Sequence, residues 1–178
     1  MSSLSFEIKA RCSDPAPVRA ILRSRRAVFK GLDHQVDTYF RAPSGRLKLR
    51  EGNIENALIY YQRNDQKNSK RCDSILYQCF KGPILKKVLR AALGILVTVD
   101  KRREIYFIGN TKFHIDRVQK LGNFVEIEVF DPDKKLGTAK LRKQCEFYRK
   151  LLGIRAQDLV PDSYSDLILK AGRRSALR

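Results

Sequence analysis

The stretch LGNFVEIEVF, residues 121–130, carries two carboxylates, Glu126 and Glu128, that alternate with three aliphatic side chains. On a β-strand, successive side chains point to opposite faces, so both carboxylates share one face and the aliphatic residues share the other. The aliphatic face predicts a hydrophobic core beside this strand. The acidic face needs an explanation of its own, because the chain is otherwise strongly basic, with 37 Lys and Arg against 19 Asp and Glu.

The net charge of the chain narrows the classes of partner. A formal charge of +18 predicts an anionic partner, which is a nucleic acid, a membrane surface or a phosphate-rich small molecule. We rank a membrane last, since no basic amphipathic helix with a Trp or Phe face is evident and the longest apolar run, residues 91–97, is too short to span a bilayer. The N-terminal residues lack an apolar signal core and the four cysteines lack C-x-x-C spacing, so we expect a cytoplasmic protein with free thiols.

Alternation of polar and apolar residues predicts β-strands along most of the chain. The predicted strands are residues 4–12, 34–41, 46–51, 56–63, 74–80, 97–108, 111–118 and 123–130. Turn signals such as Gly109-Asn110 join neighbouring strands directly, which indicates antiparallel pairs. Eight antiparallel strands suit a closed barrel, so the predicted fold class is α+β, an eight-stranded antiparallel β-barrel with helices packed on the outside.

Helix signals lie between the strands and after them. A first helix starts at Asp14-Pro15, which supply an N-cap acid and a first-turn proline, and its apolar positions continue to Val28. The further predicted helices are residues 82–94, about 132–152, and a short element near Pro161. Residues 64–73 are polar and uneven, and we expect a mobile loop there. Residues 1–170 are predicted to form a single domain, followed by a basic, frayed tail over residues 171–178.

Charged residues sort by strand when the same alternation is applied to each predicted strand. Acids lie on the first strand and the last, while bases lie on the third, fourth and sixth. A single charged face is ordinarily a solvated one, but a solvated face would mix Ser, Thr, Gln and Lys. The sorting therefore favours a charged barrel interior. Carboxylates suit a hard cation such as Mg²⁺ or Mn²⁺, and rows of Lys and Arg suit phosphate oxygens, so such an interior fits a metal–polyphosphate complex.

Several motifs, taken together, resemble one known family. They are QVDTYF (35–40), GRLKLRE (45–51), KRREIY (101–106), HIDRVQKLGNF (114–124), VEIE (125–128) and SYSDLI (163–168). In this order they resemble the CYTH family, which takes its name from class IV adenylyl cyclases and thiamine triphosphatases and belongs to the triphosphate tunnel metalloenzymes. The resemblance runs from residue 5 to residue 168, and the similarity is greatest to the cyclase branch. It implies an eight-stranded antiparallel tunnel, a triphosphate substrate and a divalent metal, Mg²⁺ or Mn²⁺.

The resemblance also implies roles for individual residues. The implied metal ligands are Glu7, Asp116, Glu126 and Glu128. The implied phosphate-binding residues are Lys9, Lys48, Arg50, Arg63, Lys101 and Arg103. Among these residues Lys9, Arg50 and Asp116 are the catalytic candidates. The chain departs from the family signature E-x-E-x-K at its first position, where it has Ser5, so one carboxylate is missing next to the expected metal site.

Three other side chains fall on the same predicted faces. His114 shares a face with Asp116, and we expect a tunnel-wall residue there, with proton transfer as the alternative. Tyr39 and Tyr61 could either stack on an organic group of the substrate or fill the tunnel.

Three functions are compatible with these residues. A phosphohydrolase would direct a metal-activated water to the terminal phosphorus of a nucleoside, thiamine or inorganic triphosphate. A class IV-type adenylate cyclase would direct the ribose 3′-hydroxyl of ATP to the α-phosphorus and release pyrophosphate and cyclic AMP. A catalytically silent tunnel would bind polyphosphate or the 5′ end of RNA through the excess positive charge. No adenine-specific motif is evident, so we favour hydrolysis.

Overall fold

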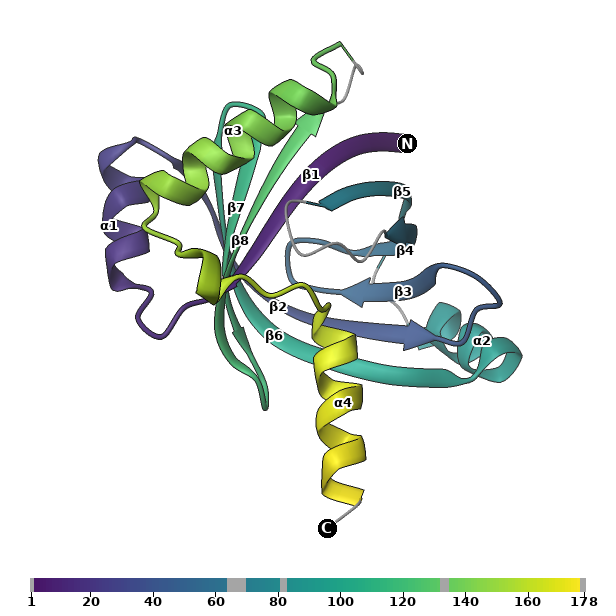
Figure 1. Cartoon of the computed structure of the whole chain (residues 1–178). Coiled ribbons are helices and arrows are strands. Elements are labelled where there is room, and N and C mark those ends of the chain that lie inside the picture. Colours follow the sequence, from purple (N-terminus) through teal and green to yellow (C-terminus); the bar gives the residue numbers. More distant parts are fainter. Residues whose placement is uncertain (1, 64–69, 81–82, 132–134, 177–178) are drawn as a thin grey trace.

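Eight antiparallel strands frame the molecule in this computed structural model, which describes residues 2–63, 70–80, 83–131 and 135–176 (Figure 1). The strands are β1 (Ser2–Arg11), β2 (Val28–Phe40), β3 (Arg46–Glu51), β4 (Ala57–Arg63), β5 (Lys70–Gln78), β6 (Ile95–Ile108), β7 (Thr111–Val118) and β8 (Gly122–Asp131). They follow one another around a closed barrel in the order β1-β5-β4-β3-β2-β6-β7-β8. The predicted α+β fold, an antiparallel barrel of eight strands, is confirmed.

β1 closes the barrel because both of its edges are paired. One edge pairs with β8, where Glu7 lies opposite Glu128 and Lys9 lies opposite Glu126. The other edge pairs with β5. Since a paired edge leaves no row of open backbone N–H and C=O groups, closure protects this strand from pairing with other chains. It also fixes the acidic residues of the first and last strands as direct neighbours.

Helices cover the outside and one end of the barrel. They are α1 (Ala16–Ser24), α2 (Pro83–Leu93), α3 (Thr138–Leu151) and α4 (Tyr164–Ala176), with a short 3-10 helix at Ala156–Asp158. α1 and α3 lie on the side of β7, β8 and β1, and α2 lies beside the ends of β2 and β6 (Figure 1). Within the described ranges, none of these helices has the length and apolar character needed to cross a membrane.

The main hydrophobic core lies between the barrel wall and the helices α1 and α3. Val125, Ile127 and Val129 of β8 are at most 1% exposed, and they belong to one buried cluster with Leu141 and Cys145 of α3. Because side chains alternate along β8, Glu126 and Glu128 must face the other way, into the barrel. The aliphatic and acidic faces of the stretch at residues 121–130 are thus explained by the two sides of one barrel wall.

The boundary between the first helix and the second strand differs from the prediction. α1 ends at Ser24, and Arg26 adopts a positive φ of 56° in the turn that follows. Val28, which helical spacing assigned to the helix, is instead the first residue of β2 and pairs with Phe107 of β6. The prediction was wrong because one apolar residue at helical spacing is a weak signal for a helix. Continuous pairing of β2 with the long strand β6 stabilises the extended conformation at Val28 instead.

Three other boundaries also change. Residues 70–73, expected in a mobile loop, belong to β5 and pair with β1, while residues 64–69 lie outside the described part of the chain. α3 begins at Thr138, because the carboxylate of Asp131 accepts hydrogen bonds from the backbone N–H groups of residues 135–137 and holds a turn before the helix. α4 continues to Ala176, so residues 171–176 of the expected frayed tail are helical.

Candidate active site inside the barrel

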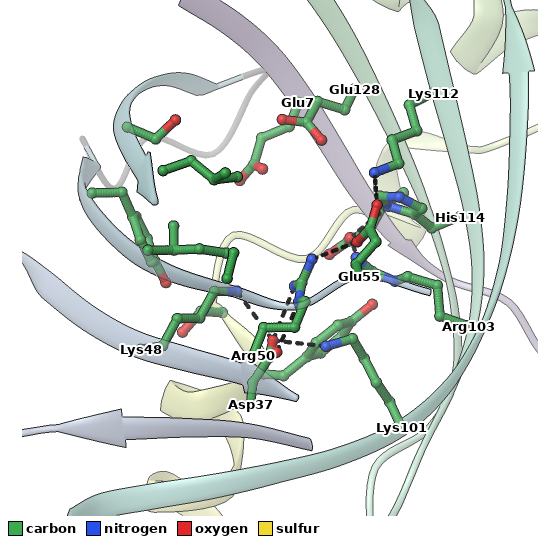
Figure 2. Close-up of a pocket in the computed structure, with 18 of the residues that line it drawn as sticks. Glu7, Asp37, Lys48, Arg50, Glu55, Lys101, Arg103, Lys112, His114 and Glu128 are labelled. Atoms are coloured by element: carbon green, nitrogen blue, oxygen red, sulfur yellow. Dashed lines mark hydrogen bonds and ion pairs between the residues drawn. The ribbon is translucent and has the colours of Figure 1, made fainter. Parts of the chain in front are cut away.

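The barrel interior holds a cavity of about 320 Å³ that is lined by side chains from all eight strands (Figure 2). The predicted site residues that line it are Glu7, Lys9, Lys48, Arg50, Lys101, Arg103, Glu126 and Glu128. Asp116 is completely buried and reaches the cavity through its contact with Arg103. Arg63 is the last residue of β4, and its side chain lies outside the part of the chain that the structure describes.

Asp37 of β2 holds three of the cations in this cavity. Its Oδ2 accepts hydrogen bonds from Nζ of Lys101 at 2.7 Å and from Nζ of Lys48 at 3.1 Å. The guanidinium of Arg50 donates to both carboxylate oxygens, from Nε to Oδ1 at 2.8 Å and from Nη2 to Oδ2 at 3.0 Å. Burial would raise the pKa of Asp37, but Arg50, Lys101 and Lys48 hold that pKa well below its ordinary value. The carboxylate is therefore ionised.

Lys101 is the cation of this group whose charge depends most on its surroundings. Its side chain is 1% exposed. Burial lowers its pKa to about 7; the carboxylate of Asp37 opposes this shift, and the positive charges of Arg50 and Arg103 add to it. An additional anion in the cavity would restore the proton that burial removes.

Arg103 of β6 links acids on two neighbouring strands. It donates to both carboxylate oxygens of Asp116 on β7, with Nε at 2.6 Å from Oδ1, and from Nη2 to Oε2 of Glu126 on β8 at 2.6 Å. The hydroxyl of Tyr164, at the start of α4, donates to Oδ2 of Asp116 at 2.7 Å. Asp116 thus fixes the position of Arg103, which itself faces the cavity.

Glu126 gathers two further nitrogen atoms. Nζ of Lys9 lies 3.2 Å from Oε1, and Nδ1 of His114 lies 3.3 Å from Oε2. Burial would raise the pKa of Glu126, but Arg103 and Lys9 hold it well below its ordinary value. Burial, assisted by Arg103, lowers the pKa of His114 to about 4, so the imidazole is neutral at pH 7 and donates from Nδ1 to the carboxylate. This neutral, buried ring agrees with a tunnel-wall residue.

Glu7 and Glu128 form an acidic pair on another side of the cavity (Figure 2). They lie directly opposite each other in the β1–β8 register. Burial, together with the charge of Glu7, raises the pKa of Glu128 to about 7. The described residues contain no ready-made group of three or more His, Cys, Asp or Glu side chains around a metal position. Two carboxylates nevertheless fit Mg²⁺ or Mn²⁺, because Mg²⁺ is usually held by one or two carboxylates together with water and substrate phosphate oxygens.

Sequence reasoning missed Asp37, Glu55 and Lys112, which all line the cavity. Asp37 and Lys112 lie on β2 and β7, and the sorting of charges by strand assigned neither acids nor bases to these two strands. Glu55 lies in the connection from β3 to β4, where no alternation identifies a face. It accepts hydrogen bonds from Nη1 of Arg50 at 2.9 Å and from Nζ of Lys112. Backbone hydrogen bonds from residues 53–55 to the carboxylate of Asp33 fix this connection.

Tyr39 and Tyr61 contribute to the cavity wall, whereas Ser5 does not. Tyr39 and Tyr61 line the cavity with their hydroxyl oxygens 3.5 Å apart, and Nζ of Lys48 lies 5.6 Å and 5.7 Å from their ring centroids. Ser5 is buried, and the residues that line the cavity on β1 are Glu7 and Lys9. Ser5 shares the inward face of β1 with Glu7 and Lys9 and lies opposite Phe130 of β8, but it is not among the residues that line the cavity.

Comparisons with known proteins agree with this geometry. A family model described as the CYTH domain matches residues 4–164. A search of the curated proteins gave no match. Among solved structures, a protein from Pyrococcus horikoshii is 25% identical with a TM-score of 0.80, over 92% of this chain and 98% of that chain.

Two further solved structures show the same fold at lower identity. An adenylate cyclase candidate from Vibrio parahaemolyticus is 16% identical, with a TM-score of 0.77 over 94% of this chain and 99% of that one. An adenylyl cyclase candidate from Hippeastrum, for which a dominant triphosphatase activity is described, is 11% identical, with a TM-score of 0.61 over 96% of each chain.

Proposed function

The chain belongs to the CYTH domain family, and we propose that it is a metal-dependent phosphohydrolase that cleaves a triphosphate bound inside the barrel. The observation that carries this proposal is the polarity of the cavity. Lys48, Arg50 and Lys101 gather on one side of it, and the acidic pair Glu7 and Glu128 lies on the other (Figure 2). A triphosphate with a divalent metal ion offers negative charge to the first group and positive charge to the second.

The basic residues supply the binding of the phosphate chain. Arg50 presents a planar guanidinium that can donate two hydrogen bonds to one phosphate group, and Lys48 and Lys101 add positive charge beside it. Lys9 and Arg103 extend this basic surface to Glu126. In the transition state of phosphoryl transfer, negative charge is spread over the oxygens of the transferred group and the leaving group. Arg50 and Lys9 are assigned to stabilising this charge by contact with those oxygens.

The acidic residues are assigned to the metal. Glu7 and Glu128 would hold Mg²⁺ or Mn²⁺, which would neutralise phosphate charge and lower the pKa of a bound water. Glu126 is a third candidate ligand, although Arg103 and Lys9 already surround its carboxylate. Asp116 is assigned to the positioning of Arg103, and it would become a ligand only by releasing that guanidinium.

The size of the cavity favours hydrolysis of a phosphate chain over cyclisation of a nucleotide. A volume of about 320 Å³ lies at the small end of ligand pockets, which span roughly 300–1,000 Å³. A compact inorganic triphosphate, or the phosphate chain of a thiamine or nucleoside triphosphate, suits that volume. The triphosphatase activity of the Hippeastrum relative supports the same choice.

A product analysis tests the proposal. Tripolyphosphate, thiamine triphosphate and ATP are each incubated with the protein and Mg²⁺ or Mn²⁺, and the products are separated by ion exchange. The proposal predicts metal-dependent release of orthophosphate without cyclic AMP. Pyrophosphate together with cyclic AMP would contradict hydrolysis and identify a cyclase. If no triphosphate is cleaved but polyphosphate or RNA binds in a salt-sensitive way, the barrel is a binding module.

A further inference from the structure

The carboxylate of Asp37 is the point at which three strands of the basic wall meet. Arg50 lies directly opposite it on β3, Lys48 lies two residues before Arg50 on the same face, and Lys101 reaches it from β6. The side chains of Asp37 and Lys101 are 3% and 1% exposed, and those of Lys48 and Arg50 are 12% and 11% exposed. The group is thus closed off from most of the solvent.

The charges of this group do not balance. Three basic side chains contact the single carboxylate of Asp37, and the second acid in reach, Glu55, divides its oxygens between Arg50 and Lys112. Cations removed from water are costly unless anions replace the lost hydration. Burial lowers the pKa of Lys101 to about 7, and the positive charges of Arg50 and Arg103 add to this shift, although Asp37 opposes it. Asp37 therefore stabilises the buried basic wall, and the three cations can still accept more negative charge.

We propose that Asp37 is a resident counter-ion that takes the place of a phosphate group when the barrel is empty and competes with that group for Lys48, Arg50 and Lys101 when substrate is bound. The inference rests on the proposed function, because it takes these cations to be the phosphate-binding wall. Asp37 is a positioning residue in this scheme. It keeps the cations in place between turnovers, and by sharing their hydrogen bonds it lowers the affinity for phosphate chains and favours release of the product.

Asp131 provides a comparison on β8. It is 2% exposed and faces the same side of the strand as Val129, away from the cavity. Its carboxylate accepts hydrogen bonds from the backbone N–H groups of residues 135–137. Replacement of Asp131 therefore removes a buried, hydrogen-bonded carboxylate, while the hydrogen bonds between Asp37 and its three cations stay in place.

The test compares Asp37→Asn and Asp131→Asn with the wild type, using thermal unfolding and calorimetric titration with inorganic tripolyphosphate in the absence of metal. Without ligand, both variants are expected to unfold at lower temperature than the wild type. With ligand, Asp37→Asn is expected to bind tripolyphosphate about tenfold more tightly than the wild type, because the three cations then lack their internal competitor. Asp131→Asn is expected to bind within about twofold of the wild type, because Asp131 has no contact with the cavity residues named above.

The outcomes separate this inference from the proposed function. If the wild type binds tripolyphosphate and Asp37→Asn binds it equally or more weakly, Asp37 is no competitor and the inference fails, while the proposed function stands. If neither the wild type nor the variants bind, both fail. Should Asp37→Asn not fold alone, it is refolded with and without tripolyphosphate. Recovery of the native circular dichroism spectrum only with ligand, and only for this variant, supports the inference, and failure to recover with ligand overturns it.

Discussion

Glu128 and Lys101 lie in the same cavity, and burial shifts their pKa values in opposite directions to about the same value. The pKa of Glu128 rises to about 7 because burial and the charge of Glu7 disfavour its carboxylate, and the pKa of Lys101 falls to about 7 because burial disfavours its ammonium. Each group regains its charge most readily when a ligand of opposite sign arrives. Binding of a cation is therefore favourable on the acidic side of the cavity, and binding of an anion is favourable on the basic side.

Replacement of Glu128 by Gln tests the acidic side. The variant keeps the size of the side chain but removes one of the two paired carboxylates, so we expect the affinity for Mn²⁺ in the presence of tripolyphosphate to fall by about tenfold or more. Metal-dependent phosphate release should be lost, and the unfolding temperature should not fall, since a buried charge has been removed. Electron paramagnetic resonance measures free Mn²⁺ directly.

Glu104→Gln is the control for this substitution. Glu104 lies on β6 and pairs with Arg19 of α1 on the outside of the barrel. The Glu104→Gln variant should bind Mn²⁺ as the wild type does. The assignment of Glu128 is wrong if both variants give the wild-type Mn²⁺ titration.

Lys101 gives a pH-dependent prediction for the basic side. At pH 8 the folded, empty protein carries little charge on Lys101, and a bound triphosphate should raise its pKa, so binding should take up close to one proton. Titration calorimetry in two buffers with different ionisation enthalpies measures this uptake, and Lys101→Met should abolish it. Equal uptake by the wild type and the variant would show that another group takes the proton.

The same pKa shift of Lys101 has a defined effect on stability. Between pH 7 and 10.5 the unfolded chain binds a proton at Lys101 that the folded chain has released. The contribution of this group to the free energy of unfolding therefore rises as the pH increases through that window. It is least favourable below about pH 7, where folding must bury the charged ammonium.

At the scale of the elements, the alternation of side chains along the strands predicted the two faces of β8, but it did not predict Glu55 or the start of β2. Val125, Ile127 and Val129 indicated a core face, and the structure places them under α3. The alternation also gave the faces of Lys48 and Arg50. It could not reveal Glu55, because a turn residue has no periodic partner, nor the start of β2, because its first residues are defined by pairing with β6 that lies far along the chain.

Arg103 tests how the strands β6, β7 and β8 are joined. Arg103→Met leaves the buried carboxylates of Asp116 and Glu126 without their shared cation, so we expect a loss of about 3–5 kcal/mol in the free energy of unfolding. Arg19→Met breaks a pair with Glu104 at the barrel surface and should cost no more than about 1 kcal/mol. Denaturation in urea gives both values. A similar small loss in the two variants would contradict the role of Arg103 as a buried link.

α3 tests whether the hydrophobic core and the site are separate. Leu141 of α3 is completely buried in the cluster outside the barrel, so Leu141→Ala should lower the free energy of unfolding by about 2–5 kcal/mol. The affinity for tripolyphosphate should not change at a temperature where the variant is folded. A large loss of affinity in the folded variant would mean that the packing of α3 determines the geometry of the interior.

At the scale of the whole molecule, the fold places its larger apolar cluster against the outer surface of the barrel wall and the charged residues of the site within the barrel. Helices α1 and α3 cover the outside, and β1 closes the ring between β8 and β5. Closure brings Glu7 opposite Glu128, although 120 residues separate them along the chain. The number and order of the strands indicated a barrel. The register of β1 with β8, and that of β2 with β6, from which Lys101 reaches Asp37, could not be read from strand patterns because each depends on how strands distant in sequence align.

The barrel interior is proposed to bind a metal–triphosphate complex with a defined polarity. Crystals grown with Mn²⁺ and tripolyphosphate, and measured at a wavelength where manganese scatters anomalously, show where the metal and the phosphates lie. We expect an anomalous peak next to the carboxylates of Glu7 and Glu128 and density for phosphates next to Lys48, Arg50 and Lys101. A structure with manganese and tripolyphosphate bound only on the outer surface, and an interior identical to that of the ligand-free protein, would contradict it.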